Sequence, residues 1–255
     1  MSRNFELMQA EHREMRRSPV SSAEPTTILF PGPEVVSKPQ RRSQEFDRTA
    51  QEECLKLVQR IFLSQPANVC RTIVFAGVDR GNGCSRICGE AARTLAANTS
   101  RPICVVDANF RSPSLNQFFN VPEGRGLSDC VLEQGTVRSF ATQLERSNLW
   151  FLPAGFLNSE SASLLYSERF VLRLQEVRRE FDYVLIDAPA LNLYSDAVAI
   201  GRTADGVVVV LEADSTRRES ALKGLESLRE AHIEVLGAVL NQRTFPIPDF
   251  VYRRL

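Results

Sequence analysis

A glycine-rich segment that follows an apolar run is the first place where this chain could do chemistry. The segment is followed by a helical pattern. Glycines let the backbone approach a phosphate closely, and the free N–H groups at the start of a helix attract anions. A serine in such a loop places its hydroxyl on a phosphate-bound Mg²⁺. The segment predicts binding of ATP or ADP with Mg²⁺, although a plain tight turn has the same pattern. Its cofactor-binding residues are Gly81, Asn82, Gly83, Cys84, Ser85 and Arg86, with Ser85 as a metal ligand.

The phosphate-contacting lysine of such loops is missing. Cys84 stands at its position, and no lysine occurs between Lys56 and Lys223. A charge-assisted hydrogen bond contributes roughly 1.5–3 kcal/mol, so its loss lowers nucleotide affinity on the order of tenfold to a hundredfold. Phosphoryl transfer suffers more, because it depends on positioning and charge neutralisation. Arg80 or Arg86 offers a partial substitute, but a guanidinium is not a compact ammonium group.

Polar side chains also end three of the apolar runs. Asp187 completes a Walker-B pattern and is suited to hold Mg²⁺ through water. Asp107 could order a metal-bound water or accept a proton, and capping the next turn is its structural alternative. Asn241 could read a base edge or simply form a turn, and Arg243 is grouped with it in nucleotide binding. Because open α/β sheets build their sites at the carboxyl ends of strands, we expect these residues at one edge. Asp107 and Asp187 are the catalytic and metal-binding candidates.

Apolar runs of strand length alternate with helical patterns along most of the chain. This alternation indicates a parallel sheet that is covered on both faces. The fold class that we expect is α/β, P-loop NTPase-like, with a mostly parallel twisted sheet in a three-layer α/β/α arrangement. The expected strands are residues 72–76, 103–107, 149–153, 183–187, 206–212 and 235–241. The expected helices are residues 45–63, 85–98, 113–119, 159–180, 195–201 and 217–231.

Residues 1–43 differ in composition from the rest of the 255-residue chain. A short helical pattern is followed by prolines with Ser and Thr between them, which predicts a flexible tether. Residues 44–255 are expected to form the P-loop NTPase-like domain with a short C-terminal tail. A net charge of zero argues against a general nucleic-acid binder, and no apolar stretch is long enough to span a bilayer. We therefore expect a cytoplasmic protein that reaches the membrane only through a partner.

The six cysteines have no spacing typical of a disulfide framework or a metal site. Cys70 and Cys104 lie in or beside apolar runs and are expected to be ordinary buried residues. Cys84 and Cys88 lie four residues apart at a helix start, where a thiol has a lowered pKa and is more reactive. A redox sensor at Cys84 is therefore an alternative function, in which oxidation would block the phosphate site.

These motifs and their order make the chain similar to the bacterial tyrosine kinases of capsule and exopolysaccharide synthesis, a branch of the deviant-Walker ATPases. The resemblance runs from about residue 44 to residue 243. The kinase loop ends Pro-Gly-Glu-Gly-Lys-Ser-Thr and corresponds to residues 80–86. The kinase motif Asp-Ala-Asp-Leu-Arg-Arg-Pro-Ser-Leu corresponds to residues 107–115. Further segments that resemble the family are residues 126–129, 152–155, 163–170 and 182–189.

The resemblance implies partners and an assembly. Active members work with a membrane-anchored regulator of polysaccharide chain length, bind Mg·ATP at subunit interfaces and phosphorylate a tyrosine-rich C-terminal tail in trans. Their oligomers use a helix motif Glu-x-x-Arg-x-x-Arg, which Glu53, Lys56 and Gln59 match only in part. The expected partners are such a regulator or an active kinase sibling, with no nucleic acid. A homo-oligomer is a further expectation that the partial match leaves open.

Four departures from the family bear on catalysis. Cys84 replaces the lysine, Asn109 the second aspartate and Arg86 a threonine, and the tyrosine tail is absent, with Tyr252 as its one acceptor candidate. We therefore expect a tyrosine-kinase-like protein of exopolysaccharide or capsule biosynthesis and export that acts as a catalytically impaired regulator or adaptor. Two alternatives stay open: an active autokinase with a rewired loop that uses Arg80 or Arg86, and a partition- or division-type ATPase switch.

Overall fold

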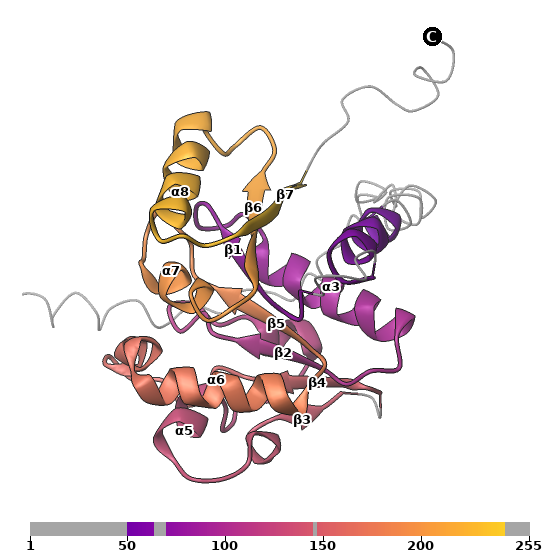
Figure 1. Ribbon diagram of the computed structural model, residues 1–255, viewed down its shortest axis with the longest axis vertical. Coiled ribbons are helices and arrows are strands. Elements are labelled where there is room, and N and C mark those ends of the chain that lie inside the picture. Colours follow the sequence, from indigo (N-terminus) through magenta and orange to yellow (C-terminus); the bar gives the residue numbers. More distant parts are fainter. Residues whose placement is uncertain (1–49, 64–69, 145–146, 243–255) are drawn as a thin grey trace, which may run out of the picture. The chain divides into compact units, whose positions relative to one another are not determined.

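A seven-stranded sheet is the central layer of the protein in its computed structural model, which describes residues 50–63, 70–144 and 147–242. The strand order is β3-β4-β2-β5-β1-β6-β7, and every neighbouring pair is parallel except β3 and β4 (Figure 1). The expected parallel α/β fold is therefore confirmed. The strands are β1 (Thr72–Gly77), β2 (Ile103–Asp107), β3 (Thr142–Gln143), β4 (Leu149–Leu152), β5 (Tyr183–Ala188), β6 (Gly206–Glu212) and β7 (Val235–Asn241).

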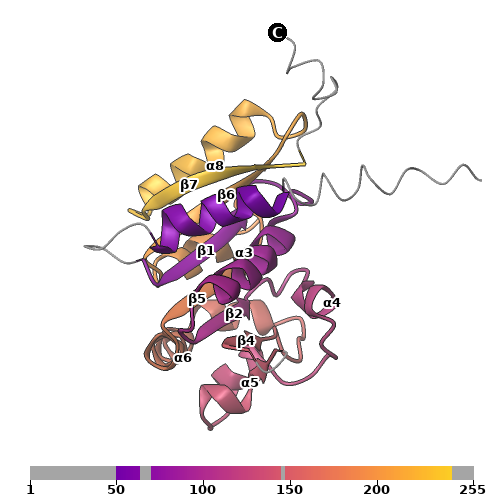
Figure 2. The same cartoon turned by 90° about the vertical axis from the view of Figure 1, so that its right-hand side faces the viewer.

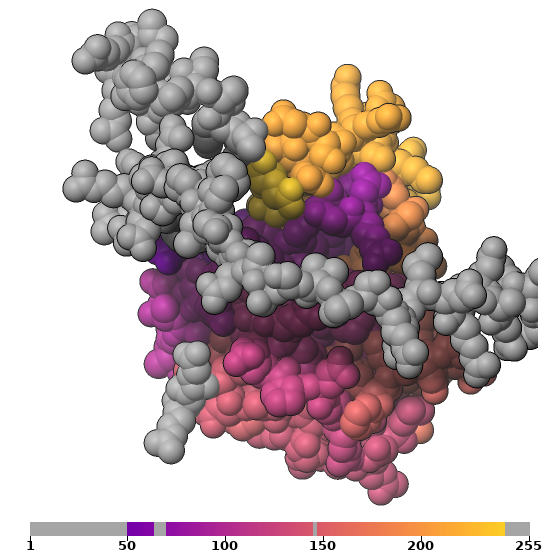
Figure 3. Space-filling view, turned by 180° about the vertical axis from the view of Figure 1, so that it is seen from behind, coloured from indigo at the N-terminus to yellow at the C-terminus, as the bar shows by residue number. Residues whose placement is uncertain are grey.

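Helices cover both faces of the sheet, so the three-layer expectation is also confirmed (Figure 2). One face packs against the helix of residues 50–63, α3 (Cys84–Asn98) and α4 (Leu115–Phe119). The opposite face packs against α5 (Leu127–Leu132), α6 (Glu168–Glu180), α7 (Asp196–Gly201) and α8 (Arg218–Glu230). Seen from behind, the indigo and purple residues lie between the yellow C-terminal elements above and the pink residues below (Figure 3).

The central strands are buried on both sides, which explains their unbroken apolar runs. All six residues of β1 and all six of β5 are buried. Successive side chains of a strand point to opposite faces of the sheet. Because each face meets a layer of helices, both sets of side chains must be apolar. The pairing register places Asp107 of β2 beside Asp187 of β5, and Phe75 of β1 on the other side of Asp187. The carboxyl ends of these strands thus share one edge with the glycine loop.

The structure differs from the sequence expectation at residues 159–180. Instead of one helix, a 3-10 segment, η3 (Ser161–Tyr166), precedes α6. Ser167 separates the two, because its backbone is extended and its Oγ accepts a hydrogen bond from the N–H of Phe170 at 3.2 Å. Serine is a preferred residue at this N-cap position. The expectation did not include α5, the 3-10 segment η2 (Val137–Ser139) or the exposed strand β3.

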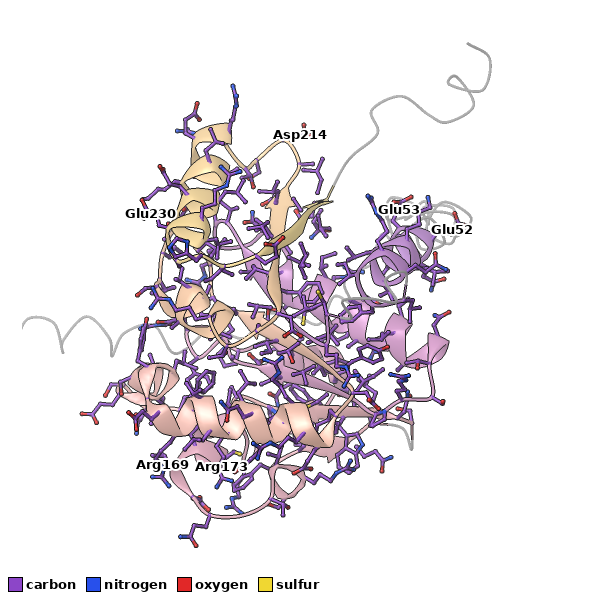
Figure 4. All side chains as sticks on the ribbon, viewed as in Figure 1. Glu52, Glu53, Arg169, Arg173, Asp214 and Glu230 are labelled. Atoms are coloured by element: carbon purple, nitrogen blue, oxygen red, sulfur yellow. The ribbon has the colours of Figure 1, made fainter. Side chains whose placement is uncertain are left out.

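The helix expected at residues 45–63 is present in its described part. It is α-helical over residues 50–58 and continues as a π-helical turn, η1 (Gln59–Leu63). Glu53 lies on this helix (Figure 4), and its Oε1 pairs with Lys56 Nζ at 2.7 Å. Residues 45–49 and the expected tether 1–43 lie outside the described residues. Within the described ranges, no helix combines the length and apolarity needed to cross a membrane.

Candidate functional site

The glycine loop connects β1 to α3 in the geometry that the sequence predicts. Gly81 has φ 91° and Gly83 has φ 74°, which are backbone conformations that favour glycine. The N–H of Asp79 donates to Asn82 Oδ1 at 2.7 Å, so the buried Asn82 side chain folds back on its own loop. α3 begins at Cys84. Its first turn presents backbone N–H groups that have no partner within the helix, as anion binding requires.

The side chains of Ser85 and Asp187 are hydrogen-bonded to each other next to this loop. Ser85 Oγ donates to Asp187 Oδ2 at 2.5 Å, and Asp187 is fully buried. Its other oxygen, Oδ1, has no hydrogen-bond partner among the described residues. Burial, and secondly the nearby charge of Asp107, raises the pKa of Asp187 to about 8. A hydroxyl beside a carboxylate oxygen that lacks a partner is a donor set of the type Mg²⁺ prefers, so the residues fit a magnesium ion.

Cys84, at the position where the family motif has lysine, is the first residue of α3. Its thiol lies close enough to Asp187 to feel the charge of that carboxylate. Burial, followed by the charge of Asp187, raises the pKa of the Cys84 thiol well above its usual value, and burial does the same for Cys88. The expectation of a lowered thiol pKa is therefore wrong, because burial beside a carboxylate outweighs the helix N-terminus. Of the two ordinary cysteines, Cys104 is buried as expected and Cys70 only partly.

The side chain of Asp107 accepts hydrogen bonds from the backbone of the loop that follows it. Its Oδ1 accepts from the N–H of Asn109 at 3.1 Å, and its Oδ2 accepts from those of Ser114 and Leu115, both at 3.2 Å. Burial raises the pKa of Asp107 to about 6, while these three backbone hydrogen bonds oppose the shift. The structure thus contains the capping arrangement that was the alternative for this residue. A metal or proton-transfer role for Asp107 stays a prediction.

Asn241 supports the phosphate loop from the end of β7. Its Nδ2 donates to the backbone oxygen of Asn82 at 2.9 Å, and Gln242 Nε2 approaches the oxygen of Gly81 at 3.5 Å. A Cβ added to Gly83 would lie only 2.3 Å from Asn241 Nδ2, so this close approach needs glycine. Base reading by Asn241 stays a prediction. Arg243, grouped with Asn241 in the sequence, lies outside the described residues.

Two further side chains hold the loop, and the sequence motifs gave no signal for either. Asn82 Nδ2 donates to Thr216 Oγ1 at 3.3 Å, in the turn between β6 and α8 that also contains Asp214 (Figure 4). Asn192, in the segment after β5, donates from Nδ2 to Asp79 Oδ1 at 3.2 Å. The loop is therefore held by the segments that follow β5, β6 and β7.

The two arginines proposed as substitutes for lysine lie at opposite ends of the loop. Arg80 precedes Gly81, and Arg86 lies in the first turn of α3; both side chains are exposed. Neither forms an ion pair with another described residue. The structure therefore brings together the glycine loop, Ser85, Asp187 and Asn241, and leaves these two guanidinium groups in solvent.

The parallel sheet, the glycine loop and the serine–aspartate pair define the class of the protein, a P-loop NTPase-type α/β protein. Comparison with known families then gives a closer assignment. A family model described as "Cellulose biosynthesis protein BcsQ" matches residues 70–227, more than half of the chain. The chain belongs to this family.

Individual relatives carry kinase names. The chain is 25% identical over 194 residues to the "Putative tyrosine-protein kinase CapB" of Staphylococcus aureus. This alignment covers 76% of this chain and 85% of the relative. It is 28% identical over 180 residues to the "Tyrosine-protein kinase YwqD" of Bacillus subtilis, at 66% and 76% coverage. The crystal structure of the chimerical protein CapA2B2 superposes with a TM-score of 0.71 at 25% identity, covering 76% of this chain and 85% of the other. The expected kinase resemblance is confirmed.

Proposed function

We propose that this protein is a cytoplasmic, tyrosine-kinase-like regulator or adaptor of exopolysaccharide or capsule biosynthesis and export, with weakened binding of Mg·ATP. The observation that carries the proposal is Cys84, which stands at the lysine position of the kinase motif and whose thiol lies close to Asp187. The fold and the Ser85–Asp187 pair are kept, while the cation that neutralises transferring phosphate is lost. The family description, a cellulose biosynthesis protein, supports a role in polysaccharide synthesis. The kinase names of the relatives support the kinase-like part of the proposal.

Different residues of the site would hold different parts of a bound Mg·nucleotide. Backbone N–H groups of the glycine loop and the first turn of α3 would hold the phosphates. Ser85 Oγ and Asp187 would hold Mg²⁺, which supplies charge neutralisation at the phosphates when bound. Asn241 keeps the loop in shape through the oxygen of Asn82. Without the lysine we expect affinity lower by on the order of tenfold to a hundredfold.

Calorimetric titration of Mg·ATP and Mg·ADP tests the nucleotide part of the proposal. The wild type is compared with Cys84→Lys and Asp187→Ala, and Asp182→Ala, immediately before the same strand, is the matched control. We expect weak binding by the wild type, at least tenfold tighter binding by Cys84→Lys, loss in Asp187→Ala and no change in Asp182→Ala. Wild-type affinity equal to that of Cys84→Lys would show that the missing lysine costs nothing.

Capture from membranes tests the partner part. The tagged full chain is incubated with detergent-solubilised membranes that contain a polysaccharide chain-length regulator, and with an active kinase sibling. We propose that one of the two is retained and that the Cys84→Lys variant retains it equally, because an adaptor needs its surface more than its nucleotide. Failure to retain either partner would remove the adaptor role, whatever the calorimetry shows.

An active autokinase is the second candidate, and the exposed guanidinium groups of Arg80 and Arg86 favour it, since both flank the loop without an ion-pair partner among the described residues. Incubation of the purified chain with Mg·ATP, followed by mass spectrometry for phosphotyrosine, distinguishes it. Phosphotyrosine that disappears in Asp187→Ala would favour this candidate over the impaired adaptor.

A further inference from the structure

A second polar cluster is formed by side chains from three places: the segment after β2, the segment after β5, and the 3-10 segment η3 itself. Its centre is Asp196, the first residue of α7, whose side chain is 1% exposed. Arg111 Nε donates to Asp196 Oδ2 at 2.8 Å, and Arg111 Nη2 donates to Oδ1 at 3.3 Å. A buried carboxylate requires such a partner, and the two-point contact holds its orientation. The cluster is separate from the Ser85–Asp187 pair and has no part in the proposed nucleotide site.

Tyr166 completes the cluster from the end of η3. Its Oη donates to Asp196 Oδ1 at 2.7 Å and lies 2.9 Å from Ser195 Oγ. The residue is nevertheless 54% exposed. Burial of the phenol, as the largest cause, raises the pKa of Tyr166, so the phenol carries its proton at neutral pH. A reaction at this oxygen therefore needs a base, and Asp196 is already in hydrogen-bond contact with the proton.

The other tyrosines of the described residues lack this combination. Tyr183 is 5% exposed and its ring packs edge-on against Phe62. Tyr194 is 37% exposed, but its ring is covered by the Arg111 guanidinium at 4.6 Å from the ring centre. No carboxylate of a described residue is hydrogen-bonded to either hydroxyl. Tyr166 alone among them combines a half-exposed residue with a carboxylate that accepts a hydrogen bond from its hydroxyl.

We propose that Tyr166 is a phosphorylation site, modified in trans by an active tyrosine kinase that holds Mg·ATP. The phenolic oxygen forms a bond to the γ-phosphorus, the bond from that phosphorus to the bridging oxygen of ADP breaks, and ADP leaves. The phenolic proton passes to Asp196 Oδ1. The chain itself needs no kinase activity for this step. The proposal rests on the proposed partnership with an active kinase sibling and names the residue on which that sibling acts.

Phosphorylation would change the segment that leads from the nucleotide site. A phosphate adds a charge of about −1.5 to −2 at neutral pH and competes for guanidinium groups. Arg111 is the cation nearest to Tyr166 in the cluster, and 38% of its side chain is exposed, so it has room to turn. When Arg111 moves to the phosphate, Asp196 is left buried without its cation beside a new anion. Ser195 and the start of α7, eight and nine residues beyond Asp187, then lose their hydrogen bonds to Tyr166 of η3.

The test uses the full chain, Mg·ATP and recombinant YwqD of Bacillus subtilis, whose phosphorylation of itself in the same tube shows that the kinase is active. Phosphopeptide mass spectrometry locates and quantifies phosphate on the chain. Tyr166→Phe keeps the ring and removes the acceptor, Tyr194→Phe is the matched control, and Asp196→Asn removes the proton acceptor. A thermal melt confirms that each variant is folded.

We expect phosphate on the peptide that contains Tyr166, at least tenfold less incorporation in Tyr166→Phe, and unchanged incorporation in Tyr194→Phe. Asp196→Asn should lower the initial rate about 100-fold. Phosphate only on another tyrosine, or none on the chain while YwqD labels itself, would overturn the proposal. If Asp196→Asn does not fold, Tyr166→Phe still decides the site. Calorimetry and membrane capture do not enter this readout, so it can fail while the adaptor role stands.

Discussion

Two aspartates at neighbouring strand ends are both buried, but they differ in their hydrogen-bond partners. Asp107 accepts hydrogen bonds from three backbone N–H groups, which stabilise its ionised form. Asp187 accepts from the side chain of Ser85 and has one buried oxygen without a partner in the described part of the chain. Ionisation of Asp187 is therefore costly unless a cation arrives. The carboxylate with an unused oxygen is the better candidate for a metal ligand.

Stability without metal should fall as pH rises from about 4 to about 8. The pKa of Asp187 is about 8 in the folded protein, above the usual unfolded value of about 3.9, so the folded state retains a proton that the unfolded state has released. The contribution is fully present below pH 4 and lost once pH passes 8. Urea unfolding in EDTA at pH 5, 6, 7 and 8 measures it. Asp187→Asn should show a flatter dependence, and Asp182→Asn should keep the wild-type slope. Parallel curves for wild type and Asp187→Asn would contradict this assignment.

The thiol of Cys84 should react slowly with iodoacetamide. Its pKa is raised by burial and by Asp187, so little thiolate is present at pH 7.5, and the thiolate is the nucleophile. We expect a rate at least tenfold below that of a free cysteine, measured by mass spectrometry of the modified peptide. Cys70, whose pKa is raised to a smaller extent, serves as the internal comparison. Equal or faster modification of Cys84 would revive the redox-sensor alternative.

At the scale of elements, the six longer strands could be predicted from their apolar runs. Such a run is expected where a strand is buried on both faces, as β1, β2 and β5 are along their whole length. The two-residue strand β3 could not, since both its residues are exposed and carry no apolar signal. The apolar pattern of residues 159–180 keeps the same helical spacing throughout, so it predicts a single helix. Only the hydrogen bond of the Ser167 side chain shows where the helix is interrupted. For the site, strand ends located Asp187, but the contacts of Asn241 and Cys84 depend on side-chain directions that spacing does not contain.

The loop after β2 should depend on Asp107 for its stability. Asp107→Ala removes the acceptor of three backbone N–H groups, and an unsatisfied buried group costs about 1–3 kcal/mol. We expect a loss of about 3 kcal/mol in the free energy of unfolding by urea, in the absence of nucleotide. Asn109→Asp, two residues away, is the matched control and should change stability by less than about 0.5 kcal/mol. A silent Asp107→Ala with lost nucleotide binding would instead support the catalytic prediction.

The turn after β4 should depend on Gly155. Its φ is 90°, and an added Cβ would lie 2.4 Å from Asp129 Oδ2, the oxygen that accepts from the N–H groups of Gly126 and Phe156. Gly155→Ala should therefore lower the free energy of unfolding by about 1–3 kcal/mol. Gly124→Ala is the control, because no atom lies within 4 Å of its added Cβ and its φ is ordinary. Equal melting curves for the two variants would contradict the prediction.

At the scale of the whole molecule, the sheet has separate cores on its two faces, and the helix of residues 50–63 belongs to only one of them. Val58 and Phe62 are its buried anchors, and Phe62 meets Tyr183 edge to face at 5.6 Å between ring centres. This helix precedes β1, yet it closes the same layer as α3. We propose that the folded domain spans residues 44–255, with residues 1–43 as a tether.

Removal of residues 1–43 should leave the melting temperature unchanged within about 2 °C, whereas removal of residues 1–63 should lower it strongly, because the second deletion opens one face of the sheet. Phe62→Ala isolates the effect at one side chain and should cost about 3–5 kcal/mol in urea unfolding. Leu63→Ala is the adjacent control; Leu63 is 41% exposed, and its loss should cost less than about 0.5 kcal/mol. If deletion of 1–43 destabilised the protein as much as Phe62→Ala, the N-terminal residues would belong to the folded unit, and the tether assignment would be wrong.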